Sequence, residues 1–139
     1  MDLNRVKPKK PKQVLHVTLP IPISVNHIHY NTRGGGRRLT KDAEKWMSKA
    51  RASVIQQIED QGYVKEELGV WLYADVDFYF PDRRIRDNHN TFKLLFDSIE
   101  GHAFINDYYI MPRVNYCYLD KENPRIEMSI YPQKYKVIK

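Results

Sequence analysis

The sequence lacks the features that define several whole classes of protein. Cysteine occurs only once, at Cys117, which excludes an internal disulfide framework and a multi-cysteine zinc site. No apolar run approaches the ~18 residues that a membrane-spanning helix needs, and the opening residues lack the pattern of a secretory signal. We therefore expect a cytoplasmic protein without membrane association.

Glycine is also scarce, and its one run does not form a nucleotide-binding loop. Only six glycines occur, and three of them are Gly34 to Gly36. This run lacks the Gly-Lys-Ser/Thr ending that binds phosphates, so we expect no nucleotide cofactor. The simplest interpretation is a flexible hairpin tip. In the alternative, the flanking Arg33, Arg37 and Arg38 become ordered on DNA phosphates.

What the chain does contain is enough apolar sequence for one folded core. Of its 139 residues, 42% are hydrophobic and 12% are aromatic, which excludes a disordered chain. We expect a basic flexible tail at residues 1–13, a single domain at residues 14–132 and a C-terminal tail at residues 133–139.

Positive charge is concentrated in particular segments. The net charge is +6, but residues 1–12 hold five basic residues and one acidic residue, so this tail supplies +4 and the body only +2. Two arginine clusters within the body favour contact with a polyanion such as DNA. These clusters are Arg33, Arg37 and Arg38, and Arg83, Arg84 and Arg86.

Hydrophobic periodicity predicts a domain of the α+β (mixed α/β) class. The expected order is strand 14–19, helix 40–62, strand 70–80, helix 90–101, strand 108–119 and strand 126–130. The last two strands would pair as a hairpin through Asp120 to Pro124, and Pro112 places the first of them at an edge or a bulge. We expect one mixed sheet of about four strands with both helices packed on one face.

Polar residues gather at the start of the second predicted helix. Asp87 and His89 lie two apart on the approach to it. Asn90 and Lys93 share one face of the helix, with Asp97 one turn further along. A simpler alternative is a helix cap at Asn90 followed by a solvated Lys93–Asp97 ion pair, and the spacing alone does not separate the two interpretations.

A second acidic segment, Asn106–Asp107, directly precedes the strand expected at residues 108–119. A loop can return this segment to the start of the second helix and so bring Asp107 to Asp87. Paired carboxylates with a lysine and arginines nearby suit a divalent ion and a phosphate, because Mg²⁺ prefers oxygen ligands.

Strand 108–119 also carries several of the ten tyrosines. Their rings can stack on unpaired bases, but packing against a sheet face or a dimer interface is the simpler interpretation. Cys117 lies between two of these tyrosines, and we expect a buried, inert thiol.

Taken together, these segments resemble the RusA family of Holliday-junction endodeoxyribonucleases, which is common in bacteria and their phages. The resemblance covers roughly residues 14–131. It rests on the order and spacing of short segments: residues 22–26, 36–40, 86–93, 94–101 and 106–107. Membership would imply a homodimer that cuts four-way DNA junctions in recombination and repair, using Mg²⁺ or Mn²⁺ held by aspartates.

The family pattern is an aspartate pair two apart, then an asparagine, a lysine three residues on, and a distant Asp-Asp. By resemblance, Asp87 is the first aspartate, Asn90 the asparagine, Lys93 the lysine and Asp107 the second of the distant pair. His89 and Asn106 stand where the family has aspartates.

These two departures alter the expected metal site. They remove up to two negative charges, and Asp77 restores one if it points toward the site. The resemblance implies that Asp87, Asp107 and His89 hold the metal. Imidazole suits Mn²⁺ better than Mg²⁺, so we expect stronger activity with Mn²⁺. The alternatives for His89 are a role in orienting water and a loss of catalysis.

We therefore expect a metal-dependent endonuclease that hydrolyses a phosphodiester bond in branched DNA. The catalytic residues would be Asp87, Asp107, Lys93 and His89. The DNA-binding residues would be Arg33, Arg37, Arg38, Arg83, Arg84, Arg86 and Asn90. Two alternatives remain open: a catalytically weak or inactive protein that binds branched DNA, and a basic RNA-binding domain.

Overall fold

The computed structural model describes residues 13–21, 29–84, 88–133 and 137–138, except the side chains of His29, Asn88, His89, Asn90 and Asp107. The strands are β1 (Leu15–Leu19), β2 (His29–Asn31), β3 (Arg37–Leu39), β4 (Leu72–Phe80), β5 (Ile110–Leu119) and β6 (Arg125–Pro132). The helices are α1 (Lys41–Gln61), α2 (Asn88–Ile99) and the short 3-10 helix η2 (Asp107–Tyr109). The described helices include none that is long and apolar enough to cross a membrane.

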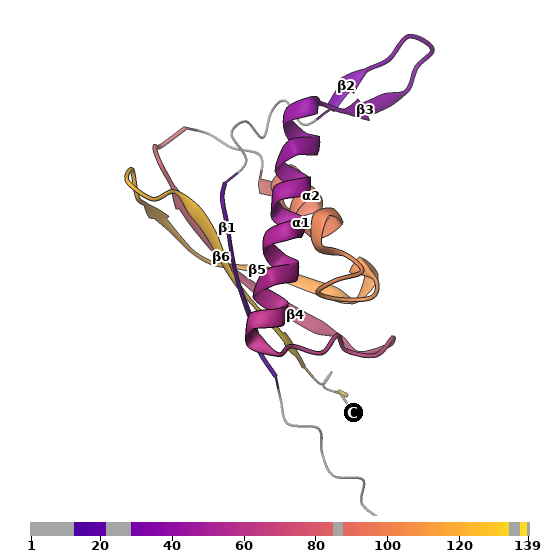
Figure 1. Cartoon of the computed structure of the whole chain (residues 1–139), viewed down its shortest axis with the longest axis vertical. Helices are drawn as coiled ribbons and strands as arrows, with labels where there is room; N and C mark the ends of the chain where they lie inside the picture. The colour runs from indigo at the N-terminus through magenta and orange to yellow at the C-terminus, as the bar shows by residue number, and fades with distance from the viewer. Residues whose placement is uncertain (1–12, 22–28, 85–87, 134–136, 139) are drawn as a thin grey trace, which may run out of the picture.

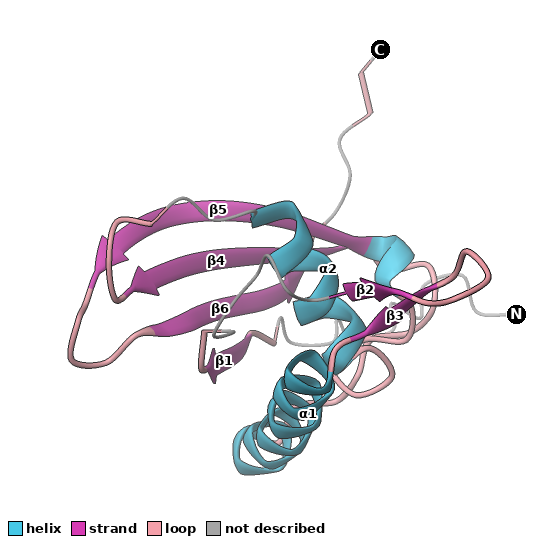
Figure 2. Cartoon of the chain, turned by 90° about the horizontal axis from the view of Figure 1, so that it is seen from above, coloured by secondary structure: helices cyan, strands magenta, loops and turns pink. Residues whose placement is uncertain are grey.

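The fold has two layers, a mixed four-stranded sheet and a pair of helices on one of its faces (Figure 2). The strand order is β1-β6-β4-β5, in which only the β4–β5 pair is parallel. Strands β2 and β3 form a separate small hairpin. The predicted α+β class, and the placement of both helices on one face, are confirmed.

The predicted hairpin between the last two strands is wrong, because β4 lies between β5 and β6. Ile126, Met128 and Ile130 of β6 are all buried, as are the alternate residues of β4, so both strands take central positions under the helices. The loop at 120–124 only has to cross one strand, a span of ~10 Å. At its start the Asp120 amide donates to the Phe80 carbonyl at the end of β4 (2.8 Å).

Helix α1 begins and ends where the sequence indicates. The Thr40 side chain accepts a hydrogen bond from the Ala43 amide (3.2 Å), which caps the first turn. Gly62 ends the helix with φ at +62°, a conformation that costs glycine little. The buried face carries Trp46, whose indole nitrogen donates to the Pro20 carbonyl (2.8 Å).

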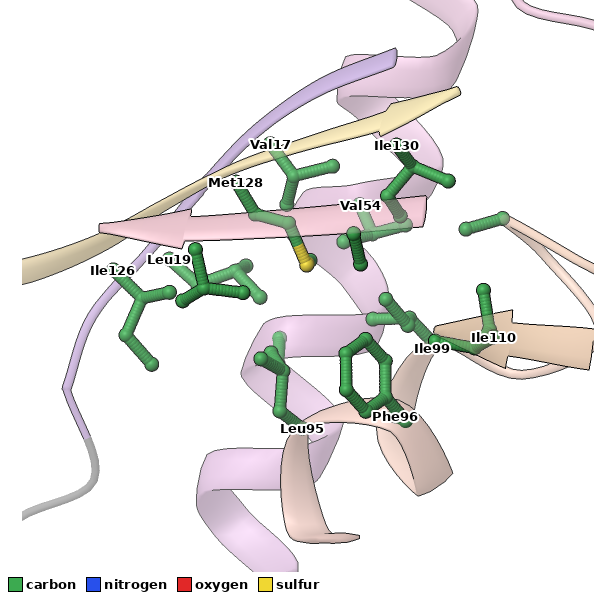
Figure 3. Close-up of a cluster of buried hydrophobic side chains, with 14 of the residues drawn as sticks. Val17, Leu19, Val54, Leu95, Phe96, Ile99, Ile110, Ile126, Met128 and Ile130 are labelled. Carbon is green, nitrogen blue, oxygen red and sulfur yellow. The ribbon is translucent and has the colours of Figure 1, made fainter. Parts of the chain in front are cut away.

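The core lies between the helices and one face of the sheet (Figure 3). Alternate residues of β4, from Leu72 to Phe78, point into it and are at most 3% exposed. Helix α2 contributes Leu95, Phe96 and Ile99, which are almost fully buried. The opposite face of the sheet, the outer face, carries the other side chains of β4: Tyr73, Asp75, Asp77 and Tyr79.

The backbone groups at the two edges of the sheet differ in their hydrogen-bond partners. Along β1, two glutamines of α1 bond the free backbone groups as a neighbouring strand would. Gln57 accepts from the Thr18 amide and donates to its carbonyl, both at 2.8 Å. Gln61 does the same for His16, at 2.9 and 2.6 Å. No hydrogen bond of this kind to the other edge, β5, is found in the described parts of the chain, so β5 is the exposed edge.

Candidate functional site

The predicted catalytic stretch, Asp87 to Lys93, leads into α2, whose first two turns pack on the sheet. Thr91 is 3% exposed, and the Phe92 ring lies 5.8 Å from the Phe78 ring of β4. Side chains on the other side of the helix therefore face solvent. Asp87 lies outside the described residues, and so do the side chains of His89 and Asn90.

Of the predicted catalytic residues, only Lys93 has a side chain that the structure describes, and that side chain is 70% exposed. Its Nζ atom lies 3.8 Å from the Asp97 carboxylate one turn further along. The solvated ion pair of the simpler alternative is therefore confirmed, but the cap at Asn90 is not, because α2 begins at Asn88. An exposed pair of this kind contributes little to stability, so the contact does not by itself explain why a lysine stands here.

The loop that leads into α2 presents two arginines to solvent. The Asp82 carboxylate accepts a hydrogen bond from the Arg84 amide (3.0 Å) and lies 3.7 Å from its guanidinium. This local turn holds the loop at the end of β4, with Arg83 and Arg84 exposed. Arg86, the third member of the predicted cluster, lies outside the described residues.

The second acidic segment lies at the far end of α2. The chain turns back directly after α2, where Glu100 pairs with Phe104 in an isolated β-bridge and the Gly101 amide donates to the Phe104 carbonyl (2.7 Å), so the segment that follows starts beside the end of α2. Helix η2 immediately precedes β5, and the Asn106 side chain accepts from the Tyr108 amide at its start (2.9 Å). The expected return of this segment to the start of α2 is therefore not seen.

Asn88 and Ile99 are the first and last of the 12 residues of α2, and the eleven steps between them span roughly 16 Å. The start of α2, which directly follows Asp87 in the sequence, and the η2 segment that begins with Asp107 thus lie at opposite ends of the helix. The side chain of Asp107 and the whole of Asp87 lie outside the described residues, so the predicted ligand set itself stays a prediction.

Asp77 does not point toward α2. It lies on the outer face, where its carboxylate accepts a hydrogen bond from the Asn115 side chain (3.0 Å). It lines a shallow polar hollow of about 420 Å³, together with Asp75 and Glu127. Asp77 of the same chain therefore does not restore the negative charge that is lost where His89 and Asn106 replace the family aspartates.

The other two acids of the hollow, Asp75 and Glu127, accept hydrogen bonds from arginines. Burial acts to raise the pKa of Asp75, but hydrogen bonds from Arg113 (2.8 Å) and Tyr131 (2.6 Å) outweigh it and hold the pKa below its ordinary value. A hydrogen bond from Arg125 (3.0 Å) lowers the pKa of Glu127. In the part of the chain that the structure describes, no group of three or more His, Cys, Asp or Glu side chains is placed to hold a metal ion.

The first arginine cluster lies on the β2–β3 hairpin, which confirms the predicted hairpin around Gly34 to Gly36. Arg33, Arg37 and Arg38 are all exposed. In the antiparallel register Tyr30 is opposite Arg38, and Asn31 is opposite Arg37. Tyr30 was not among the residues predicted from the sequence; its position two residues before the turn at Thr32 was the signal that could have indicated it.

Cys117 is exposed, which contradicts the predicted buried thiol. It pairs with Phe78 of β4 and so lies on the helix side of the sheet. Because β5 is the edge strand, the helices do not cover it there, and Val114 and Leu119 on the same side are also exposed, at 45% and 55%. The edge position expected from Pro112 is confirmed.

Residues 20–131 match the family described as endodeoxyribonuclease RusA. The chain belongs to the RusA endodeoxyribonuclease family. No similar sequence is found among curated proteins. The matched region contains every predicted site residue from Arg33 to Asp107, and RusA membership implies a Holliday-junction resolvase that acts on branched DNA.

Proposed function

We propose that this RusA chain is a metal-dependent endonuclease that resolves four-way and other branched DNA in recombination and repair. The observation that carries the proposal is the family match over residues 20–131, which includes both the Asp87–Lys93 stretch and Asp107. The reaction is hydrolysis of a phosphodiester bond by in-line attack of water.

The residues proposed to hold the metal are Asp87, His89 and Asp107, with Mn²⁺ favoured over Mg²⁺. Carboxylate and imidazole ligands fit this pair of ions. A bound divalent ion would lower the pKa of a water molecule and offset charge on the phosphate. The described acids of the outer face already have side-chain partners, since Asp75 and Glu127 bond arginines and Asp77 bonds Asn115.

Lys93 is proposed to stabilise negative charge on the phosphate in the transition state. Its side chain is mostly exposed, and its pairing with Asp97 at 3.8 Å is weak enough to be exchanged for a phosphate oxygen. Its place on the solvent side of α2, next to the half-buried Phe92, directs it away from the core.

The DNA would be bound by the β2–β3 hairpin and by the loop before α2, through Arg33, Arg37, Arg38, Arg83, Arg84, Arg86 and Asn90. The described parts of both segments lie toward the same end of the molecule, the upper end in Figure 1. Each arginine that neutralises a phosphate releases a counterion, so binding should weaken steeply with salt.

We further infer a homodimer that pairs through β5. A four-way junction has approximate two-fold symmetry, which a two-fold dimer matches with one site for each of two opposed strands. Strand β5 has ten residues, forms the exposed edge and carries exposed Val114, Tyr116 and Leu119. Such an edge readily pairs with a second chain, whereas Gln57 and Gln61 occupy the β1 edge.

A cleavage assay tests the proposal. Labelled four-way junction, duplex and stem-loop RNA are incubated with the protein in Mg²⁺, Mn²⁺ or EDTA. Paired, metal-dependent nicks in the junction would support the nuclease. Retention of the junction without nicks would favour a binding protein, the alternative suggested by His89 and Asn106 in place of aspartates, and preference for RNA would contradict both.

A further inference from the structure

The β2–β3 hairpin extends away from the rest of the molecule beyond the start of α1 (Figure 1). Leu39, at its base, packs against the hydrophobic core. From Tyr30 to Arg38 the side chains are exposed, with Thr32 half-buried. The outer part of the hairpin therefore contributes little to the core, although its two strands are held in a fixed register.

The tip of the hairpin is narrow because three successive residues have no side chain. Gly34 and Gly35 have φ values of +101° and +90°, which other residues adopt only with strain. A Cβ atom on Gly36 would lie 2.8 Å from the Thr32 hydroxyl. The Thr32 amide donates to the Gly36 carbonyl (2.8 Å) and closes the turn. The tip is thus about as wide as two paired strands, ~4.8 Å between axes.

The two faces of the hairpin carry different chemistry. Residues opposite each other in an antiparallel pair share a face, so Tyr30 and Arg38 lie together on one face, while Asn31 and Arg37 lie together on the other. The Tyr30 side chain is 49% exposed. No acidic residue occurs from residue 29 to 39, and no ion pair to these arginines is found among the described residues. One face therefore combines an accessible aromatic ring with a cation.

We propose that the hairpin is a wedge that enters the opening at the branch point of DNA, where Tyr30 stacks on an exposed base and Arg38 binds the neighbouring phosphate. The inference rests on the proposed function, because it needs branched DNA as the partner. Aromatic rings stack on any base whose face is accessible.

The same features argue against a duplex as the target of Tyr30. Within a continuous duplex each base is covered by its neighbours, so a ring can stack only after a base step has been opened. At a branch point the terminal pairs of the arms already expose a face. The wedge thus lets the protein distinguish a junction from the duplex arms, whereas arginine contacts to phosphate bind both.

The test measures affinity for a four-way junction and for a duplex of the same sequence, in EDTA so that neither is cut. Tyr30→Ala should weaken junction binding by about 5- to 150-fold, the range for loss of one stacked base, and leave duplex binding unchanged. Tyr30→Phe should retain the preference for the junction, and Tyr30→Leu, which keeps an apolar side chain without a ring, should lose it. Arg38→Ala should weaken binding to both DNAs and lower the salt slope by about 1.

The matched control for charge is Lys49→Ala, an exposed position on α1, which should change neither the preference nor the slope. Equal weakening of junction and duplex by Tyr30→Ala, or an unchanged ratio, would overturn the wedge. The proposed function would still stand if the unsubstituted protein cut the junction in a parallel reaction with Mn²⁺. Absence of junction binding by the unsubstituted protein would overturn both.

Discussion

The Lys93 ammonium lies 3.8 Å from the Asp97 carboxylate on the solvent side of α2, with the two side chains 70% and 39% exposed. A structural ion pair and a catalytic lysine both fit this geometry, but they differ in what the loss of each partner should do. A pair that only stabilises the helix would make Lys93 and Asp97 equally important, at a few tenths of a kcal/mol.

Lys93→Gln should lower the rate of junction cleavage by roughly 100-fold, the scale for removing one group that stabilises transition-state charge. Asp97→Asn should leave the rate nearly unchanged. Neither substitution should change the free energy of unfolding by more than about 0.5 kcal/mol. Single-turnover cleavage and urea unfolding measure the two effects, and equal effects of both variants on the rate would show that Lys93 acts only through Asp97.

His89 should make activity depend on both metal and pH. Cleavage should be faster in Mn²⁺ than in Mg²⁺ and should fall as the pH drops through roughly 6.5, because a ligating imidazole must be neutral. His89→Asp should reduce the preference for Mn²⁺ and flatten the pH profile. Rates from pH 5.5 to 8 in each metal give the measurement, and a flat profile for the unsubstituted protein would argue against ligation by His89.

Strand β5 should hold the dimer together. Val114→Lys places a charge on this edge strand and should yield a monomer in sedimentation equilibrium. Ile55→Lys on α1 is the matched control, because Ile55 is 44% exposed and Val114 is 45% exposed. We expect the control to remain dimeric, and a dimeric Val114→Lys protein would place the interface elsewhere.

Acid should destabilise the fold through the arginine-bonded carboxylates. The pKa values of Asp120 and Glu127 are lowered mainly by hydrogen bonds from Arg125, and that of Asp75 by Arg113 and Tyr131 against the opposing effect of burial. A carboxyl whose pKa is lower when folded adds stability above its unfolded pKa of about 4, and this stability is lost as the pH falls through the folded value.

The free energy of unfolding in urea should therefore decrease steadily below about pH 4. Glu127→Gln removes one of these carboxylates and should make that decrease shallower. The substitution should also lower stability at neutral pH, because Arg125 then loses a charged partner. An identical pH dependence for both proteins would mean that Glu127 does not contribute.

Local signals in the sequence predicted the elements well. Thr40 and Gly62 mark the ends of α1 because capping depends on residues next to the helix. The strict alternation through β4 follows from its having one face under the helices and one open face. In each case the signal lies within the element itself or in the residues next to it.

Relations between distant segments were harder to predict. A short loop after β5 normally indicates a hairpin, but the loop crosses over β4, and that choice depends on which strands bury alternate residues. Cys117 is exposed for the same reason, because this strand order places β5 at the edge of the sheet. The placement of Asn106–Asp107 at the far end of α2 depends on the turn that pairs Glu100 with Phe104, which spacing along the sequence does not reveal.

That placement has a consequence for the two acids of the proposed metal site. Helix α2 begins directly after Asp87 in the sequence and the η2 segment with Asp107 lies at its other end, so we expect the site to take Asp87 from one copy and Asp107 from the other. A mixture of Asp87→Asn and Asp107→Asn proteins then regains one intact site in each mixed dimer. If both acids came from one chain, no mixed dimer would have an intact site.

The most direct test is therefore cleavage of a labelled four-way junction in Mn²⁺ by the unsubstituted protein, each single variant and their mixture, with junction binding measured beside it. We predict paired nicks from the unsubstituted protein, full binding without nicks from Asp87→Asn and from Asp107→Asn, and partial recovery of cutting in the mixture. Undiminished cutting by either single variant would contradict the claim that these two acids hold the metal ion.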